Sequence, residues 1–227
     1  EDGITPLYMA AQYGHVEVVD RLMAARCDVE HVCANGGTLL MGAAESGRVE
    51  MVDRLLAAGC SVGARNLDGA TAVHRACVAG HVGALERLIA AKGDINQPQH
   101  DGITPLAIAV RHQHLKVLEH LVDAGCDVNR EDPNGGTALH YAVYLGSFEL
   151  AHCLLASKSK VNKPTVNGST ALHVAVQKGR QDLTDLLIVC GANVHLQTAD
   201  GTTPLAMALA GQHHSVAFSL RRAGAQR

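Results

Sequence analysis

Histidine and cysteine are the residues of this chain that could bind a metal or take part in catalysis. The 227 residues include 14 histidines and seven cysteines. His112 and His114 form the segment HQH, and His213 stands beside His214. A zinc site needs several such ligands that converge on one point. Neighbouring side chains on a helix point apart, and no cysteine or carboxylate completes either set, so the sequence predicts neither a metal site nor a cofactor site.

The sequence also lacks the short motifs that accompany common enzymatic chemistry. It contains no GxxxxGK[ST], HExxH or GxSxG segment, and no GxGxxG segment that leads from a strand into a helix. The glycine-rich segments ANGGT and PNGGT are better explained as turns, because they recur at a fixed interval. Nucleic-acid binding is disfavoured, since the net charge is −3 and no stripe of Lys or Arg alternates with aromatic residues. The sequence therefore predicts a protein that is not an enzyme.

A threonine recurs every 33 residues, without an insertion or deletion, and marks the elements that hold these side chains. The seven positions are Thr5, Thr38, Thr71, Thr104, Thr137, Thr170 and Thr203. Each follows a turn that contains glycine, and three are followed by proline: Pro6, Pro105 and Pro204. A threonine hydroxyl can cap a helix, and proline is well tolerated at the first helical position. The spacing predicts a turn, a cap and a helix start in every copy.

Apolar residues in each copy predict two helices. Leucine or valine stands two residues after each threonine, and alanine stands five residues after it in all seven copies. A second apolar set follows at 13, 14, 17 and 18 residues, as in Val117, Leu118, Leu121 and Val122. This spacing indicates a second amphipathic helix. Two short helices cannot bury their apolar faces alone, so the copies are expected to stack on one another.

The repeat resembles the ankyrin repeat family in its period, its TAVH and TALH segments and its GCDVN and GANVH segments. The resemblance implies an all-α solenoid of stacked helix pairs with projecting β-hairpin turns. It also implies that His74, His140 and His173 form hydrogen bonds within and between turns. We expect one domain, 1–227, with repeats 2–34, 35–67, 68–100, 101–133, 134–166, 167–199 and 200–227. Gln113 and Gln212 depart from the pattern, because they replace the glycine between the helices.

The repeat phase also assigns most cysteines to packing positions. Cys27, Cys60, Cys77, Cys126 and Cys190 stand where other copies carry small or apolar residues, so we expect them to be buried and to resist a thiol reagent in the folded protein. Cys33 and Cys153 are left unassigned. The odd number of cysteines and the absence of a CxxC pair predict free thiols in a reducing compartment, the cytosol or nucleus.

The two ends of the chain differ in charge and in their terminal residues. Residues 1–133 carry 11 Lys and Arg against 18 Asp and Glu, a net charge of −7, whereas 134–227 carry 8 against 4, a net charge of +4. The basic excess centres on Lys158, Lys160 and Lys163, and it either steers an acidic partner or is only a solvated edge. Arg221 occupies a phase that is apolar in the other copies, which suits a terminal cap in water. The first copy has no such substitution, so we expect further sequence ahead of it.

The resemblance implies that a protein partner binds along the concave side, on the hairpin tips and the ends of the first helices. The residues at these phases are predicted to face water, although tip residues such as Leu67 and Val166 could instead pack between hairpins. The implied partner is a peptide segment or exposed helix, apolar with acidic residues, bound by a monomer without membrane insertion. The alternative is a recruiting module of a larger enzyme or channel. The predicted partner-binding residues are Tyr13, Leu67, Val78, His100, Ile103, Arg111, His112, Tyr144, Leu145, Val166, Gln177 and Lys178.

Overall fold

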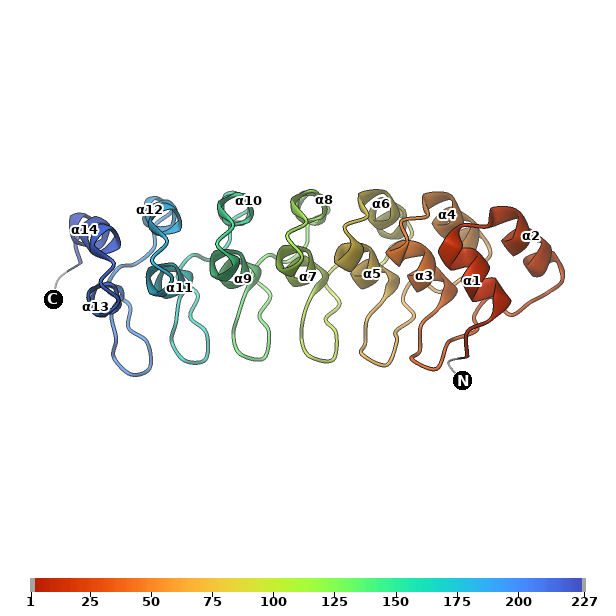
Figure 1. Ribbon diagram of the computed structural model, residues 1–227, viewed down its shortest axis with the longest axis horizontal. Coiled ribbons are helices and arrows are strands. Elements are labelled where there is room, and N and C mark those ends of the chain that lie inside the picture. The colour runs from red at the N-terminus through yellow and green to blue at the C-terminus, as the bar shows by residue number, and fades with distance from the viewer. Residues whose placement is uncertain (1–2, 226–227) are drawn as a thin grey trace. The chain divides into compact units, whose positions relative to one another are not determined.

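The computed structural model describes residues 3–225, which form helix pairs joined by hairpin turns (Figure 1). The chain divides into two compact units, 1–126 and 127–227. The first unit contains α1 (Pro6–Tyr13), α2 (Val16–Ala24), α3 (Leu39–Glu45), α4 (Val49–Ala57), α5 (Ala72–Ala79), α6 (Val82–Ala90), α7 (Pro105–Arg111) and α8 (Leu115–Asp123). The second contains α9 (Ala138–Leu145), α10 (Phe148–Ala156), α11 (Ala171–Gln177), α12 (Gln181–Val189), α13 (Pro204–Ala210) and α14 (His214–Arg222).

Helices pack in two rows within each unit. In the first unit α3 lies between α1 and α5, and α5 also contacts α7, while α6 lies between α4 and α8 in the second row. In the second unit α11 lies between α9 and α13, and α12 lies between α10 and α14. Strand pairing in the described residues is limited to one isolated bridge, between Val32 and Thr38. The all-α prediction is therefore confirmed, and the hairpins are turns rather than extended strands.

The threonine that marks each copy caps the first helix, as the sequence predicts. The hydroxyl of Thr5 accepts a hydrogen bond from the backbone N–H of Tyr8 at 3.1 Å, and Thr104 accepts one from Ala107 at 3.2 Å. In three copies the cap also involves the histidine of the TAVH or TALH segment. Nδ1 of His74 accepts a hydrogen bond from the N–H of Thr71 at 3.1 Å and lies 2.9 Å from its Oγ1.

The apolar phases form the core in both units. The alanine five residues after each threonine is buried in all seven copies. The residue two positions after each threonine is buried as well, and these residues are Leu7, Leu40, Val73, Leu106, Leu139, Leu172 and Leu205. Close packing of the first helices explains the alanines, since a larger side chain would push neighbouring helices apart. Arg221 is exposed, and its interpretation as a terminal cap stays a prediction.

A row of ion pairs links the second helices of the first unit. Nη1 of Arg54 lies 2.6 Å from Oδ2 of Asp20, and Nε of Arg87 lies 3.5 Å from Oδ1 of Asp53. His120 and Glu86 continue the row, with 3.0 Å between Nε2 and Oε1, and this contact is an ion pair when the His120 ring is protonated. In each pair the carboxylate comes from one copy and the basic side chain from the next, one residue further along the helix. We call this row the ion-pair ladder.

Two of the five cysteine predictions are wrong. Cys60, Cys77 and Cys126 are buried, but Cys27 and Cys190 are exposed. Cys190 directly follows α12, at a phase where the equivalent alanines also reach solvent, so small size there does not indicate burial. Cys27 shares the phase of Cys60 and Cys126 but belongs to the first copy. Burial raises the pKa of the Cys60 thiol to about 11, and it also raises that of Cys77.

Candidate protein-binding surface

Side chains at the ends of the first helices face solvent in both units. Tyr13, the last residue of α1, is 56% exposed, and Tyr144 near the end of α9 is 60% exposed. Arg111 ends α7, and His112 follows it; both are exposed. These helices end because a residue in the left-handed conformation follows them: Gly14, Gln113 and Gly146 have φ of 79°, 60° and 74°. The reversal leads into the second helix, which leaves the end of the first helix open to a partner.

Tyr144 and Lys178 form the best-defined contact on this surface. Lys178 caps the C-terminal end of α11, and its Nζ lies 4.3 Å from the centre of the Tyr144 ring. An ammonium group over an aromatic face is attracted by the negative potential of the ring. Leu145 follows Tyr144 directly and is 38% exposed, and Phe148 at the start of α10 is 39% exposed. We call these four residues the Tyr144 cluster.

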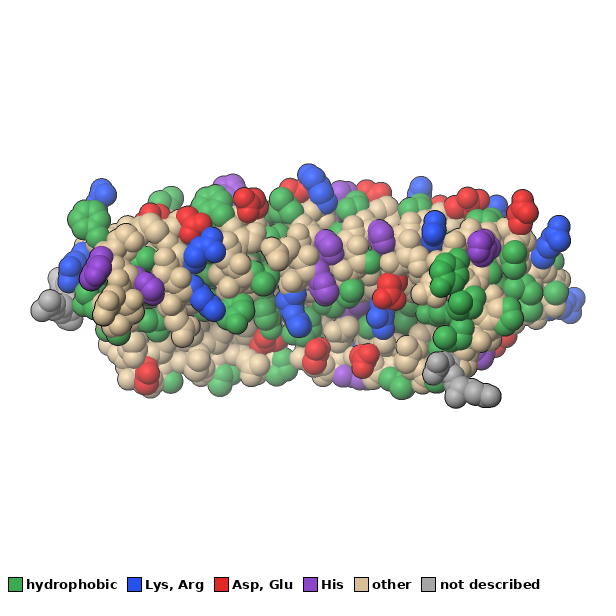
Figure 2. All heavy atoms as spheres, in the orientation of Figure 1, with side chains coloured by type: hydrophobic (Ala, Val, Ile, Leu, Met, Phe, Trp, Pro, Cys, Tyr) green, Lys and Arg blue, Asp and Glu red, His purple; other side chains and the backbone are tan. Residues whose placement is uncertain are grey.

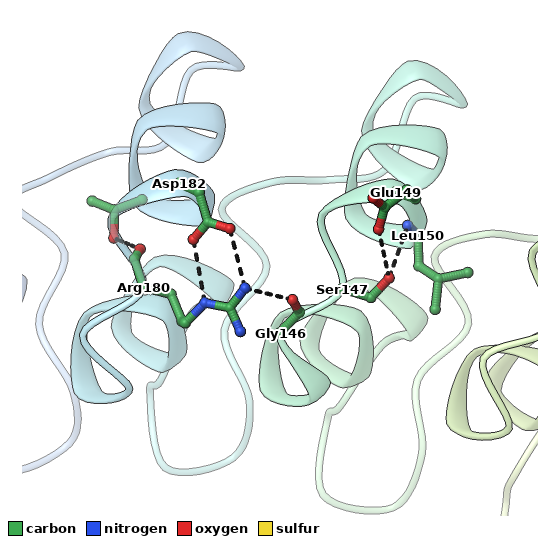
Figure 3. A network of polar contacts seen from close by, with 7 residues as sticks. Gly146, Ser147, Glu149, Leu150, Arg180 and Asp182 are labelled. Carbon is green, nitrogen blue, oxygen red and sulfur yellow. Dashed lines mark hydrogen bonds and ion pairs between the residues drawn. The ribbon is translucent and has the colours of Figure 1, made fainter.

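Arg180, two residues after Lys178 in the sequence, is already neutralised by Asp182 (Figure 3). Its Nη2 donates to the carbonyl oxygen of Gly146 at 2.7 Å and lies 3.1 Å from Oδ2 of Asp182. The hydrogen bond from Arg180 lowers the pKa of the Asp182 carboxyl below its usual value. Lys178, in contrast, forms no ion pair with any described residue. Lys178 is therefore the positive charge of the cluster that remains available to a carboxylate.

The hairpin tips present side chains to water while their backbones pair with the preceding hairpin. The N–H of Leu67 donates to the carbonyl of Asn35 at 3.1 Å, and that of Val166 donates to Asn134 at 2.8 Å. Leu67 is 69% exposed and Val166 is 78% exposed. The alternative that these side chains pack between hairpins is therefore wrong. His100 lies at the equivalent tip and is exposed as well.

Ile103 does not face water, which corrects the prediction for this position. It is 7% exposed, because it lies at the base of the hairpin, where its carbonyl accepts a hydrogen bond from the N–H of Gln99 at 2.9 Å. Ala70, one copy earlier, is buried in the same way. Val78 is half-buried, and its carbonyl oxygen lies 3.0 Å from Nε2 of His114. Ile103 is thus a packing residue of the hairpin.

The histidines that could act chemically lie apart from any metal-binding arrangement. The rings of His112 and His114 stack with their centres 6.1 Å apart, so they do not converge on one point. Partial burial lowers the pKa of His112, and His114 and Arg111 lower it further. Residues 3–225 contain no group of three or more His, Cys, Asp or Glu side chains that could hold a metal ion. No helix in this range is long and apolar enough to cross a membrane.

The structure also exposes residues that the sequence reasoning did not select. Phe148 begins α10 and stacks on His152 at 6.1 Å, and Phe218 of α14 is 62% exposed beneath Arg222. These are the only phenylalanines of the chain. The sequence offers one signal for the exposure of Phe148, because it lies three residues after the predicted surface residue Leu145. It was missed because its phase carries apolar residues in several copies and was not considered a surface position.

A family model described as "Ankyrin repeats (3 copies)" matches residues 1–66, 40–132 and 124–198. The chain belongs to the ankyrin repeat family. Ankyrin repeat domains are protein–protein interaction modules, and the ankyrin fold is typically non-catalytic. The match covers the copies marked by Thr5 to Thr170, whereas the copy marked by Thr203 lies beyond residue 198. It confirms the expectation that the repeats are ankyrin repeats.

Two solved structures are similar to this chain over nearly its full length. The ankyrin repeat domain of Bcl-3, described as a unique member of the IkappaB protein family, is 29% identical, with a TM-score of 0.88. That match covers 97% of this chain and all of the Bcl-3 chain. The human ASB11 ankyrin repeat domain is 25% identical, with a TM-score of 0.85, and covers 99% of this chain and all of its own. A search of curated protein sequences found no match.

Proposed function

We propose that this ankyrin repeat domain binds a protein partner on the first-helix ends and hairpin tips, the side that is concave in the family. The ligand is a peptide segment or exposed helix that carries an apolar side chain next to a carboxylate. The Tyr144 cluster carries this proposal, since it combines exposed apolar area with an uncompensated ammonium group. An aromatic residue in such a setting is typical of the few positions that contribute most binding energy.

The remaining predicted residues extend the proposed surface within each unit. In the second unit these are Val166 at a hairpin tip and Gln177 beside Lys178. In the first unit they are Tyr13, Leu67, Val78, His100, Arg111 and His112, and the exposed guanidinium of Arg111 offers a second contact for an acidic ligand. We further propose that the domain acts as a monomer in a reducing compartment, which the free, exposed thiols of Cys27 and Cys190 support.

A displayed library of random peptides, selected on the 227-residue chain, provides the test. We expect the selected peptides to combine leucine or an aromatic residue with aspartate or glutamate. Calorimetric titration should show that Tyr144→Ala weakens the binding of such a peptide by about tenfold or more, as expected for an aromatic anchor that costs about 2 kcal/mol when truncated. The variant should unfold at the same denaturant concentration as the parent chain, because Tyr144 lies outside the core.

Phe218→Ala is the matched control. Phe218 is as exposed as Tyr144 and also lies beneath a cation, 5.9 Å from Cζ of Arg222, but it belongs to a second helix. We expect this variant to bind the peptide like the parent chain. If Phe218→Ala weakened binding and Tyr144→Ala did not, the site would lie on the second helices and the proposed surface would be wrong.

A further inference from the structure

A polar hollow lies between two hairpins of the second unit, 165–169 and 198–202, beside α11 and α13. Its walls include Ser169 of one hairpin, Asp200 and Thr202 of the other, Gln177 of α11 and Met207 of α13. Its volume is about 320 Å³. Sites for small ligands usually measure about 300–1,000 Å³, so this hollow is at the lower limit. It has room for one large side chain of a partner.

Asp200 gives the hollow a negative charge. Its Oδ1 accepts hydrogen bonds from the hydroxyl of Thr198 and, at 3.1 Å, from the N–H of Thr202. These hydrogen bonds lower the pKa of the Asp200 carboxyl below its usual value of 3.8, so the group is ionised at neutral pH. Within residues 3–225, Asp200 forms no ion pair. Its charge therefore remains available to a cationic group of a partner.

The other walls of the hollow are uncharged. Ser169 and Gln177 each carry a side-chain oxygen that can accept a hydrogen bond, while Ala199 and Met207 are apolar. Figure 2 shows few charged side chains over the hairpins near the C-terminal end of the face that it draws. A guanidinium group has five N–H donors that need several acceptors, and its aliphatic stem packs on apolar surface. This composition suits the side chain of arginine better than the compact ammonium group of lysine.

Gln177 links the hollow to the Tyr144 cluster, because it directly precedes Lys178. The Nζ of Lys178 lies over the Tyr144 ring of α9, whereas the hollow lies toward α13, and α11 packs between these two helices. Neighbouring helices pack about 8–10 Å apart. An extended peptide rises about 3.3 Å per residue, so about two or three residues span this spacing. One short peptide can therefore reach both places.

We propose that the hollow binds an arginine side chain of the partner peptide, two or three residues from the carboxylate that contacts Lys178. This inference rests on the proposed function, since it assigns a second charged contact to the same peptide. The guanidinium group pairs with Asp200 and its stem packs on Met207. The ligand of the second unit then carries an apolar side chain, an acidic residue and an arginine at a fixed spacing.

Asp200→Asn is the variant that tests this inference, because it removes the charge and keeps the turn. Asn35 and Asn167 occupy the equivalent position in two other copies. Their Oδ1 atoms accept the N–H of the residue two positions on, at 2.9 Å and 3.1 Å, as Oδ1 of Asp200 does. The variant should therefore unfold at the same urea concentration as the parent chain.

The random-peptide library, selected on both chains, gives the first readout. Peptides selected on the parent chain should carry arginine two or three residues from the acidic residue. Peptides selected on Asp200→Asn should keep the apolar and acidic residues and lose the enrichment in arginine. Equal arginine content in the two sets of peptides would overturn the inference.

Calorimetric titration of a peptide selected on the parent chain gives the second readout. Asp200→Asn should weaken its binding about three- to fivefold, the range of an exposed ion pair, and so should replacement of the peptide arginine by glutamine. Both changes together should weaken binding no more than either one alone, because they remove the same contact. Additive losses would show that Asp200 and the arginine do not touch, which would also overturn the inference.

Asp185→Asn is the matched control. It makes the same charge change in the second unit, but Asp185 lies on α12, where its Oδ2 accepts a hydrogen bond from Nε2 of Gln181 at 2.7 Å. We expect this variant to bind the peptide like the parent chain, and a loss equal to that of Asp200→Asn would indicate a general effect of charge and overturn the inference. The proposed function would survive each of these failures, because the apolar and acidic residues of the peptide and the effect of Tyr144→Ala do not depend on Asp200. Peptides that lack the apolar and acidic residues on both chains would instead overturn the proposed function.

Discussion

Gln113 shows what a single residue contributes to the reversal between two helices. Its φ is 60°, the left-handed conformation that glycine adopts in most other copies, and Gln212 shares it with a φ of 56°. A side chain in this conformation costs about 1–2 kcal/mol, because Cβ approaches the following carbonyl oxygen. The copy after Gln113 also differs from the pattern, since it carries Ser147 where other copies have His or Arg.

We predict that Gln113→Gly stabilises the first unit. Relief of the left-handed strain exceeds the extra entropy that glycine loses on folding, so the expected gain is about 0.5–1 kcal/mol. Urea unfolding measures it. Gln177→Gly is the control, because Gln177 ends α11 in helical conformation and should lose about 0.5–1 kcal/mol on the same change. A loss of stability in Gln113→Gly would show that the Gln113 side chain makes a contribution that outweighs its strain.

The threonine–histidine cap is a property of the helix start, and it makes folding sensitive to acid. His74, His140 and His173 bind the caps of α5, α9 and α11 through Nδ1 and are buried. Burial lowers the pKa of His74 from 6.5 to about 4, and it also lowers the pKa of His140 and of His173. A protonated ring could no longer accept the backbone N–H at Nδ1. The cap is therefore intact only when these rings are neutral.

We predict that the free energy of unfolding falls as the pH drops below about 6.5, the ordinary histidine pKa. Between that value and the lowered pKa the unfolded chain binds protons that the folded chain excludes, so stability is complete above pH 6.5 and is lost toward pH 4. His74 alone should account for about 2 kcal/mol by pH 5. Asp182 acts only at lower pH, because its pKa lies below 3.8.

Urea unfolding at pH 7.5 and pH 5 measures this loss. His74→Gln should be less stable than the parent chain at pH 7.5 but should lose less on acidification, whereas His152→Gln, at an exposed position, should change neither value. Equal stability of the parent chain at both pH values would show that the buried rings are not the cause.

Helix starts and core phases were predictable because they depend on contacts that every copy repeats. Thr5 and Thr104 cap their helices by the same bond, and Leu7 and Leu106 are buried alike. Burial at other phases depends on where a copy stands. Cys27 and Cys60 share a phase, but only Cys60 is buried, and no property of the residue itself distinguishes them. Sequence alone therefore predicts an internal copy better than a terminal one.

At the scale of the whole molecule, part of the predicted binding surface could be inferred and part could not. The positions of Tyr144 and Lys178 in the repeat correctly predicted that both side chains are exposed. The repeat did not predict the burial of Ile103, because Ile103 lies only three residues after the exposed tip residue His100, at the base of the same hairpin. The partition into one domain, 1–227, and its seven repeats stays a prediction, since the chain forms two compact units, 1–126 and 127–227. The proposed function therefore rests on individual exposed side chains, such as Tyr144 and Lys178, and not on an extended groove.

Charge across the molecule gives the last prediction. The C-terminal part, 134–227, has a net charge of +4, and Lys178 is its uncompensated charge beside Tyr144. We predict that Lys178→Glu slows association of an acidic, apolar peptide about threefold or more at low salt, because charges at a binding surface act mainly on the encounter. The effect should shrink near 1 M salt, where the screening length is about 3 Å. Stopped-flow binding at several salt concentrations measures it.

Lys160→Glu is the control. It makes the same charge change in the basic part of the chain, 134–227, but at a residue that lies away from the first-helix ends. If only net charge mattered, both variants would slow association equally. If the peptide binds at the Tyr144 cluster, the Lys178 ammonium group of the parent chain contacts the peptide carboxylate directly. Lys178→Glu should then slow association more than Lys160→Glu does, and it should also speed dissociation. An equal effect of the two variants, with no change in dissociation, would mean that Lys178 lies outside the contact and that the basic residues act only as a distant field.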